Sequence, residues 1–223
     1  MKQPPIEYQF NYPKIIYSDN TPPDPTDNVK TSGCGLVSMY MALKAFGIVV
    51  TLQQLVDLSL KNHFRVAAGT DWGFFPYVAK MYGLTLKQTD DESEVTSALK
   101  NGSLCICSMG PGLFTKHGHF ILAYDSDGSN FFVNDPNSSA RTGKKFSIKD
   151  IFKLQHKEYF IFTKPQSETE QYTLAGAIDA WSKLGIIGSP EDMKKDFIDN
   201  KVPARFGAFL LKSANFIKEK GLI

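Results

Sequence analysis

The sequence predicts an α+β protein, because helical patterns dominate residues 35–100 and strand patterns dominate from residue 103 to residue 163. Of the 223 residues, 42% are hydrophobic and 22% are charged, which is typical of a globular chain. Phenylalanine alone contributes 17 residues, so a substantial core is available. A formal net charge of +2 gives no reason to expect nucleic acid as a partner.

Four helices are predicted before residue 100. Gly47 is expected to end the first of them, and Thr51 with Gln54 forms a capping box that opens the second. A proline-rich arm of about thirty residues, with a strand-like stretch at 14–18, is expected to lie extended ahead of them. The predicted helices are 35–45, 51–60, 75–82 and 92–100, with a short strand at 84–88.

The second half of the first domain is predicted to be a mostly antiparallel sheet, with strands at 103–109, 119–124, 131–134 and 159–163. We therefore expect one domain over residues 1–164. Residues 165–172 are polar and lack apolar periodicity, which indicates a linker. Residues 173–223 carry helical patterns throughout and predict a three-helix module.

The chain contains no run of eighteen apolar residues, so no membrane span is predicted. Its first residues lack the apolar segment of a secretory signal. Three cysteines, an odd number, argue against a disulfide framework. We therefore expect synthesis in a reducing cytoplasm, with any action outside the cell following release by another route.

Cys34 is the main functional candidate, because it lies between Gly33 and Gly35 at the predicted start of a helix. The helix dipole and the free N–H groups of the first turn favour the thiolate, which is the nucleophilic form of cysteine. The flanking glycines would let a substrate backbone approach the sulfur. A packed, unreactive cysteine is the alternative interpretation.

A nucleophilic thiol needs a base and a group that orients the base, and His119 with Asp135 can supply both. A hairpin that pairs Tyr124 with Asn130 across a five-residue loop would place His119 directly opposite Asp135, on the same face. An even-length loop would put them on opposite faces, so this hypothesis predicts an odd-length loop. His117 is the competing base.

Three motifs in this order resemble the papain-like cysteine peptidases, and in particular the bacteriocin-leader-peptidase-like (double-glycine peptidase) branch. The motifs are Ser-Gly-Cys-Gly at 32–35, Gly-His-Phe-Ile-Leu at 118–122 and Asn-Asp-Pro at 134–136. The resemblance covers about residues 12–163. It implies a papain-like fold in which N-terminal helices pack on an antiparallel sheet.

The resemblance also implies roles for individual residues. Cys34 would be the nucleophile, His119 the general base and acid, and Asp135 the orienting carboxylate. The family has an oxyanion-binding glutamine six residues before the cysteine, where this chain has Asn28, one methylene shorter. The Cys34 N–H would be the other oxyanion donor. No metal or other cofactor is implied.

Substrate contacts are expected from the residues that flank these motifs and from the loop at 69–73. Trp72 in this loop is suited either to stacking on a substrate or to packing in the core. Cys105 and Cys107 lie two residues apart on a predicted strand; without the usual zinc-ligand spacing, they are interpreted as buried core residues. The substrate-binding candidates are Gly33, Asp71, Trp72 and Gly118.

Residues 177–190 are similar to a small helical module of lytic enzymes from Gram-positive bacteria and their phages. The sequence therefore suggests a phage- or prophage-type endopeptidase that cuts peptidoglycan stems or cross-bridges, with residues 173–223 binding the cell wall or a partner protein. One alternative is a leader-processing or intracellular cysteine peptidase. The other is a catalytically inactive papain-like fold used for binding.

Overall fold

The computed structural model describes residues 3–67, 69–165 and 181–182. The chain divides into two compact units, Met1–Lys164 and Pro165–Ile223. The predicted linker and three-helix module therefore lie almost entirely outside the described residues. Within the described part of the chain, no helix combines the length and apolar character needed to cross a membrane.

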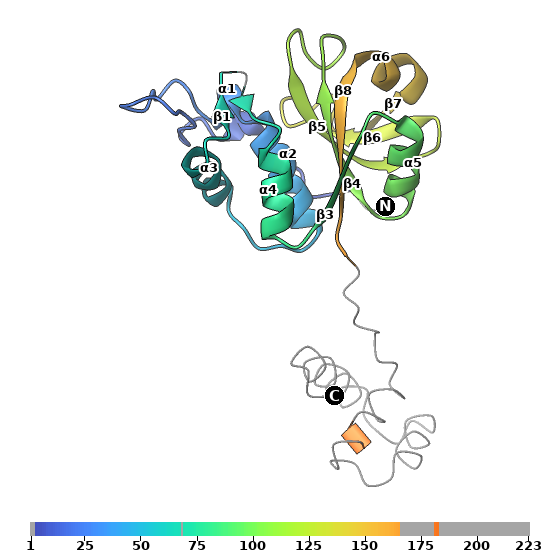
Figure 1. Cartoon of the computed structure of the whole chain (residues 1–223). Helices are drawn as coiled ribbons and strands as arrows, with labels where there is room; N and C mark the ends of the chain where they lie inside the picture. The colour runs from blue at the N-terminus through green and yellow to red at the C-terminus, as the bar shows by residue number, and fades with distance from the viewer. Residues whose placement is uncertain (1–2, 68, 166–180, 183–223) are drawn as a thin grey trace. The chain divides into compact units, whose positions relative to one another are not determined.

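The first unit is built on a six-stranded sheet with the order β3-β8-β4-β5-β6-β7 (Figure 1). Every neighbouring pair is antiparallel, as the sequence predicts. Strand β7 is not predicted, because its Lys-Lys-Phe-Ser sequence lacks a strand pattern and its side chains are exposed or half-buried. The strands are β3 (Thr85–Thr89), β4 (Leu104–Met109), β5 (His119–Ser126), β6 (Asn130–Asn134), β7 (Lys144–Ser147) and β8 (His156–Thr163).

Helices cover both faces of the sheet (Figure 1). Helices α1 to α4 lie on one side, and α5 and α6 lie on the other. The predicted helices at 35–45, 51–60, 75–82 and 92–100 are confirmed to within one residue at each end, with the capping threonine just ahead of the second. The helices are α1 (Val29–Ser32), α2 (Cys34–Ala45), α3 (Leu52–Lys61), α4 (Phe74–Met81), α5 (Glu92–Lys100) and α6 (Lys153–Gln155), with a 3-10 turn η1 at Gln9–Asn11 and a π-helical turn η2 at Ile148–Phe152.

Local chemistry explains where these helices begin and end. The predicted capping box opens α3, since Thr51 accepts from the Gln54 N–H while the Gln54 side chain accepts from the Thr51 N–H. Asp91 caps α5 by accepting from the Ser93 N–H. Gly47 follows α2 with φ at 75°, a left-handed conformation that glycine adopts without strain.

The central strand β4 is buried on both faces, so it separates two hydrophobic cores. Leu104 and Ile106 belong to the core beneath α2, α3 and α4. Cys105, Cys107 and Met109 belong to the core beneath α5 and η2. Successive side chains of a strand point to opposite faces, which is why alternate residues enter different cores.

The N-terminal arm departs from its predicted form. Its strand-like stretch at 14–18 makes only an isolated bridge, between Ile16 and Asn28. A two-stranded ribbon of β1 (Arg65–Val66) and β2 (Gly69–Thr70) lies beside α2 and is not predicted by the sequence. Strands of two residues are too short to produce a recognisable alternation.

Candidate active site

Cys34 is the first residue of α2, and Gly33 separates this helix from α1. A Cβ atom on Gly33 would lie 2.5 Å from the Val29 carbonyl oxygen, so the break requires glycine. The first N–H groups of a helix have no intrahelical acceptor, and their dipole favours an anion at this end. The predicted placement of the thiol at a helix N-terminus is therefore confirmed.

The surroundings of Cys34 stabilise its thiolate. Burial opposes ionisation, but a hydrogen bond from His119 and its positive charge outweigh that effect. The backbone N–H groups of Phe120 and Gly35 also lower the pKa of the thiol. The pKa of Cys34 therefore lies below the ordinary range of cysteine.

His119 opens β5 and joins the sulfur to a carboxylate. Its Nε2 lies 2.8 Å from Oδ1 of Asp135, which leaves Nδ1 for the hydrogen bond with Cys34. Burial lowers the pKa of the imidazole, but the bonds to Asp135 and Cys34 raise it more, to about 9. A thiolate–imidazolium pair is thus favoured at neutral pH.

Asp135 is fully buried, immediately after β6, and both of its carboxylate oxygens are used. Oδ1 accepts from His119 and from the Asn137 N–H, each at 2.8 Å. Oδ2 accepts from Nε of Arg141 at 2.6 Å. Burial raises the pKa of Asp135, but these donors together hold it below the ordinary range of aspartate.

The hairpin that brings His119 to Asp135 differs from the prediction. The last β5–β6 pair is Ser126 with Phe131, so an even number of residues, 127–130, lies between the paired positions; Asn130 belongs to β6 through its pairing with Ser147 of β7. A bulge between Ala123 and Asp125 then shifts the register by one residue. The predicted odd-length loop is wrong.

The bulge brings His119 and Asp135 back to the same face of the sheet, which the even-length loop alone would have prevented. Leu122 pairs with Asn134, and continuing this register places Asp135 opposite Ile121 rather than opposite His119. His119 and Asp135 are therefore diagonal neighbours on one face, a separation that long side chains can span. The predicted contact forms, but in a different register.

Arg141 is the site residue that sequence reasoning missed. Its guanidinium also lies over the Phe114 ring, 5.7 Å from the ring centroid. Arg141 belongs to the loop between β6 and β7, six positions after Asp135, and no motif includes it. Only the fold of this loop shows that an arginine neutralises the buried carboxylate.

Asn28 is buried immediately before α1, but its amide is not free toward the sulfur. Its Nδ2 donates to the carbonyl oxygens of Pro25 and Thr26, at 3.2 and 3.3 Å. Its Oδ1 is buried and has no partner among the described residues. The proposed oxyanion role of Asn28 stays a prediction.

The four substrate-binding candidates have different surroundings. The Gly118 Cα faces open space, whereas the Asp71 carboxylate accepts from the Gly73 N–H ahead of α4. Trp72 is 40% exposed and packs edge-on against Phe160, so it is divided between the surface and the core. Gly33 adjoins Cys34. Their contacts with substrate stay predictions.

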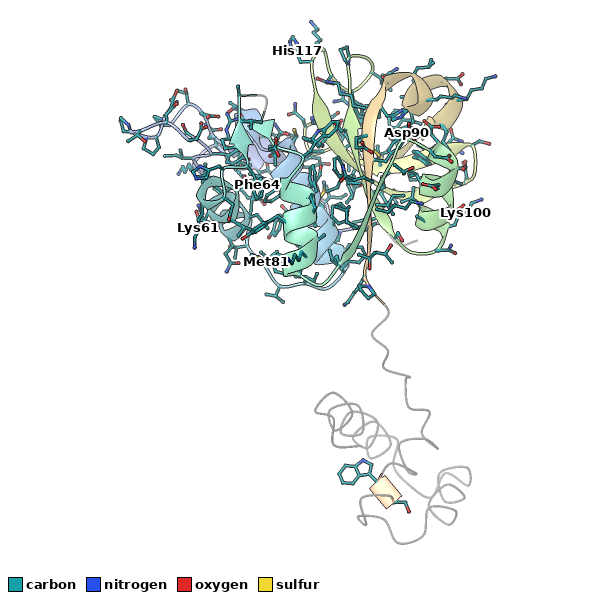
Figure 2. The ribbon with its side chains drawn as sticks, viewed as in Figure 1. Lys61, Phe64, Met81, Asp90, Lys100 and His117 are labelled. Atoms are coloured by element: carbon teal, nitrogen blue, oxygen red, sulfur yellow. The ribbon has the colours of Figure 1, made fainter. Side chains whose placement is uncertain are left out.

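The other residues considered from the sequence, His117 and the two cysteines of β4, lie outside the proposed triad. His117 lies at the end of the β4–β5 loop and points away from the sheet (Figure 2). Cys105 and Cys107 are buried as expected, with their sulfur atoms 3.9 Å apart. Among the residues that the structure describes, no group of three potential ligands could hold a metal ion.

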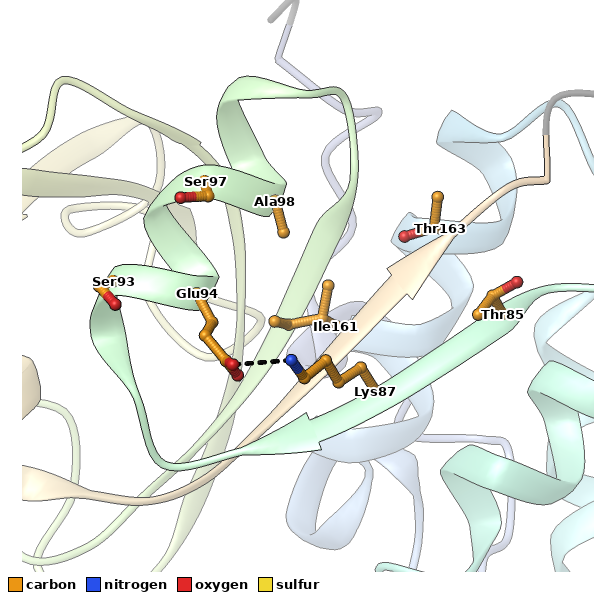
Figure 3. A pocket seen from close by; sticks show the side chains of 8 residues that line it. All are labelled: Thr85, Lys87, Ser93, Glu94, Ser97, Ala98, Ile161 and Thr163. Atoms are coloured by element: carbon orange, nitrogen blue, oxygen red, sulfur yellow. Dashed lines mark hydrogen bonds and ion pairs between the residues drawn. The ribbon is translucent and has the colours of Figure 1, made fainter.

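An open cavity of about 460 Å³ lies between α5 and the edge of the sheet formed by β3 and β8 (Figure 3). An ion pair between Lys87 and Glu94, at 2.7 Å, crosses it. Its remaining lining residues are Thr85, Ser93, Ser97, Ala98, Ile161 and Thr163. The cavity includes neither Cys34 nor His119.

Comparison with known proteins identifies the family to which the chain belongs. The model of the Peptidase_C39-like family matches residues 5–168. The chain therefore belongs to the Peptidase_C39-like family and is a cysteine peptidase. No curated protein matches its sequence.

Two solved structures are similar to this chain. The peptidase domain of Streptococcus ComA, a bifunctional ABC transporter of a quorum-sensing pathway, is 20% identical, with a TM-score of 0.49 over 61% of this chain and 93% of that one. A double-glycine-motif protease from an AMS/PCAT transporter, solved with its leader peptide, is 22% identical. Its TM-score is 0.43, over 73% of this chain and 98% of that one.

Proposed function

We propose that the chain hydrolyses peptide bonds through a triad of Cys34, His119 and Asp135. The observation that carries this proposal is the 2.8 Å contact between the His119 imidazole and the buried Asp135 carboxylate, together with the interaction of the same imidazole with the Cys34 thiolate. Because the thiol pKa is lowered and the imidazole pKa is raised, the reactive ion pair exists before substrate binds. Membership of a peptidase family supports the same chemistry.

In the proposed mechanism, the Cys34 thiolate attacks the carbonyl carbon of the scissile amide, and the C=O electrons move to oxygen. The oxyanion collapses, the C–N bond breaks, and the His119 imidazolium gives its proton to the departing amine. The neutral imidazole then removes a proton from water. The resulting hydroxide hydrolyses the thioester, which releases the acid and restores the thiolate and imidazolium.

The developing oxyanion needs hydrogen-bond donors. We propose the Cys34 N–H as one donor, since it is the first N–H of α2 and precedes the first intrahelical bond. Asn28 is the proposed second donor, which requires its amide to leave the carbonyl oxygens of Pro25 and Thr26. Loss of one oxyanion donor typically costs about 2.7–4 kcal/mol of transition-state stabilisation.

Two substrate classes follow from different observations. The similarity of residues 177–190 to modules of lytic enzymes supports peptidoglycan stems or cross-bridges and action at the cell wall, with residues 173–223 binding the wall or a partner protein. Membership of the Peptidase_C39-like family supports a peptide substrate such as a leader segment. Gly33, Asp71, Trp72 and Gly118 are the residues proposed to contact either substrate.

The experiment compares wild type with Cys34→Ala on two substrates: purified Gram-positive cell walls in zymography, and leader peptides with mass-spectrometric detection of products. The triad predicts cleavage by wild type and none by Cys34→Ala. Cleavage that survives Cys34→Ala contradicts the mechanism. Clearing of cell walls supports the lytic role, and peptide products alone support leader processing. A folded wild type inactive on both, with a thiol unreactive toward iodoacetamide, supports the binding-only alternative.

A further inference from the structure

Gln9 joins the two segments that carry the proposed nucleophile and carboxylate. It opens the turn η1 of the N-terminal arm and is only 4% exposed. Its Nε2 donates to the Lys30 carbonyl oxygen of α1, at 2.8 Å. Its backbone N–H donates to the carbonyl oxygen of Pro136, the residue after Asp135, also at 2.8 Å.

The Lys30 carbonyl has a special relation to the site. In an uninterrupted α-helix it would accept from the N–H four residues later, which belongs to Cys34. The helical pattern stops one bond earlier, where the Gly33 N–H donates to Val29. Within residues 3–67 and 69–165, no backbone hydrogen bond uses the Cys34 N–H.

We propose that Gln9 is a positioning residue for the oxyanion site. By donating to the Lys30 carbonyl oxygen, its amide competes with the Cys34 N–H for that acceptor and weakens the attraction between the two. The N–H then stays directed at the substrate oxygen. This inference rests on the proposed function, because it assigns Gln9 a role in the reaction of Cys34.

The backbone bond to Pro136 fixes the same residue relative to the carboxylate side of the site. Gln9 is therefore held by its main chain and acts through its side chain. Its Oε1 is buried without a partner among the described atoms. Gln9→Met consequently keeps the volume, removes the donor and removes an unsatisfied oxygen, so its effect on folding is expected to be small.

The test distinguishes an effect of Gln9 on the oxyanion site from an effect on the reactivity of the thiolate. We expect Gln9→Met to lower kcat by about 10- to 100-fold, a part of the loss typical for a missing oxyanion donor, with KM little changed. The affinity for a peptide aldehyde, whose hemithioacetal oxygen uses the same donors, should fall by a similar factor. Alkylation of Cys34 by iodoacetamide forms no oxyanion. The alkylation rate of Gln9→Met should therefore equal that of wild type at each pH between 5 and 8.

Glu7→Gln is the matched control. Glu7 lies in the same arm and binds Tyr12 and Lys44, at 2.5 and 2.6 Å, rather than the site. This variant should keep the wild-type kcat and aldehyde affinity. If both arm variants lose activity alike, general loosening of the arm explains the effect and the inference is overturned.

Three further outcomes decide the proposal. A Gln9→Met variant that matches wild type in kcat and aldehyde affinity overturns it, as does a parallel change in alkylation rate. An amide-exchange measurement on wild type needs no variant: protection of the Cys34 N–H equal to that of Val37, which bonds Gly33, also overturns it. If Cys34→Ala retains activity, the proposed function itself fails; if it is inactive and Gln9→Met is not impaired, only this inference fails.

Discussion

Replacing Arg141 by methionine tests whether the guanidinium holds the buried carboxylate in place. The substitution keeps an apolar side chain beside Phe114 but removes Nε, which donates to Asp135 Oδ2 at 2.6 Å. The Asp135 side chain is fully buried, so water does not replace the lost donor readily. Oδ2 is then left unpaired in a region of low dielectric.

The expected loss of stability in Arg141→Met depends on how deeply the ion pair is buried. Removing one partner of a buried ion pair typically costs about 3–5 kcal/mol. The Arg141 side chain is 28% exposed, so solvent already screens part of this interaction. We therefore expect a loss of about 2 kcal/mol in the free energy of unfolding. For a domain of this size, that corresponds to a fall in Tm of about 4–8 °C.

Catalysis should fall as well. Without Arg141, the Asp135 carboxylate is free to turn away from His119, and the imidazolium loses its orienting partner. We expect kcat to fall about tenfold, equivalent to about 1.4 kcal/mol in the activation barrier. Arg141→Lys keeps the charge but not the planar geometry of the guanidinium, so it should give intermediate values of Tm and kcat.

Thermal unfolding and steady-state peptidase kinetics measure the two effects. Lys145→Met is the matched control, since it removes an ion pair with Asp127 in which the side chains are 56% and 35% exposed. Exposed pairs contribute little, so no clear change in Tm is expected from it. If Arg141→Met lowers Tm no more than Lys145→Met does, the argument from burial is wrong. A lower Tm with unchanged kcat would show that Arg141 serves folding alone.

Two other predictions follow from the site. Activity should fall as pH rises through the His119 pKa of about 9, because the imidazolium loses its proton. Asp135→Asn removes the carboxylate that raises this pKa, so the alkaline limb of the kcat/KM profile should move below pH 9. An alkaline limb that does not move would contradict the role assigned to Asp135. Gly33→Ala should lower Tm, because the new Cβ would lie 2.5 Å from a backbone oxygen. Gly118→Ala should leave Tm unchanged, because no atom lies within 4 Å of the new Cβ. Equal values of Tm for the two variants would contradict the steric argument.

Features with a local physical cause could be predicted from the sequence. The start of α3 follows from the capping box of Thr51, and the position of Cys34 at a helix start follows from the glycines around it. Apolar runs bounded by turn residues located the strand that carries His119 and the strand that ends next to Asp135. The helical faces and the two-sided burial of β4 likewise depend on spacing along the chain.

Tertiary structure alone decided the rest of the candidate site. The register between His119 and Asp135 depends on a bulge at the middle of a hairpin, which balances an even-length loop and leaves no mark in the local pattern. Arg141 reaches Asp135 because the loop after β6 folds back onto it. Gln9 reaches Lys30 across twenty-one positions of sequence. Spacing determines which face of an element a residue occupies, but contacts between elements depend on how the whole chain packs.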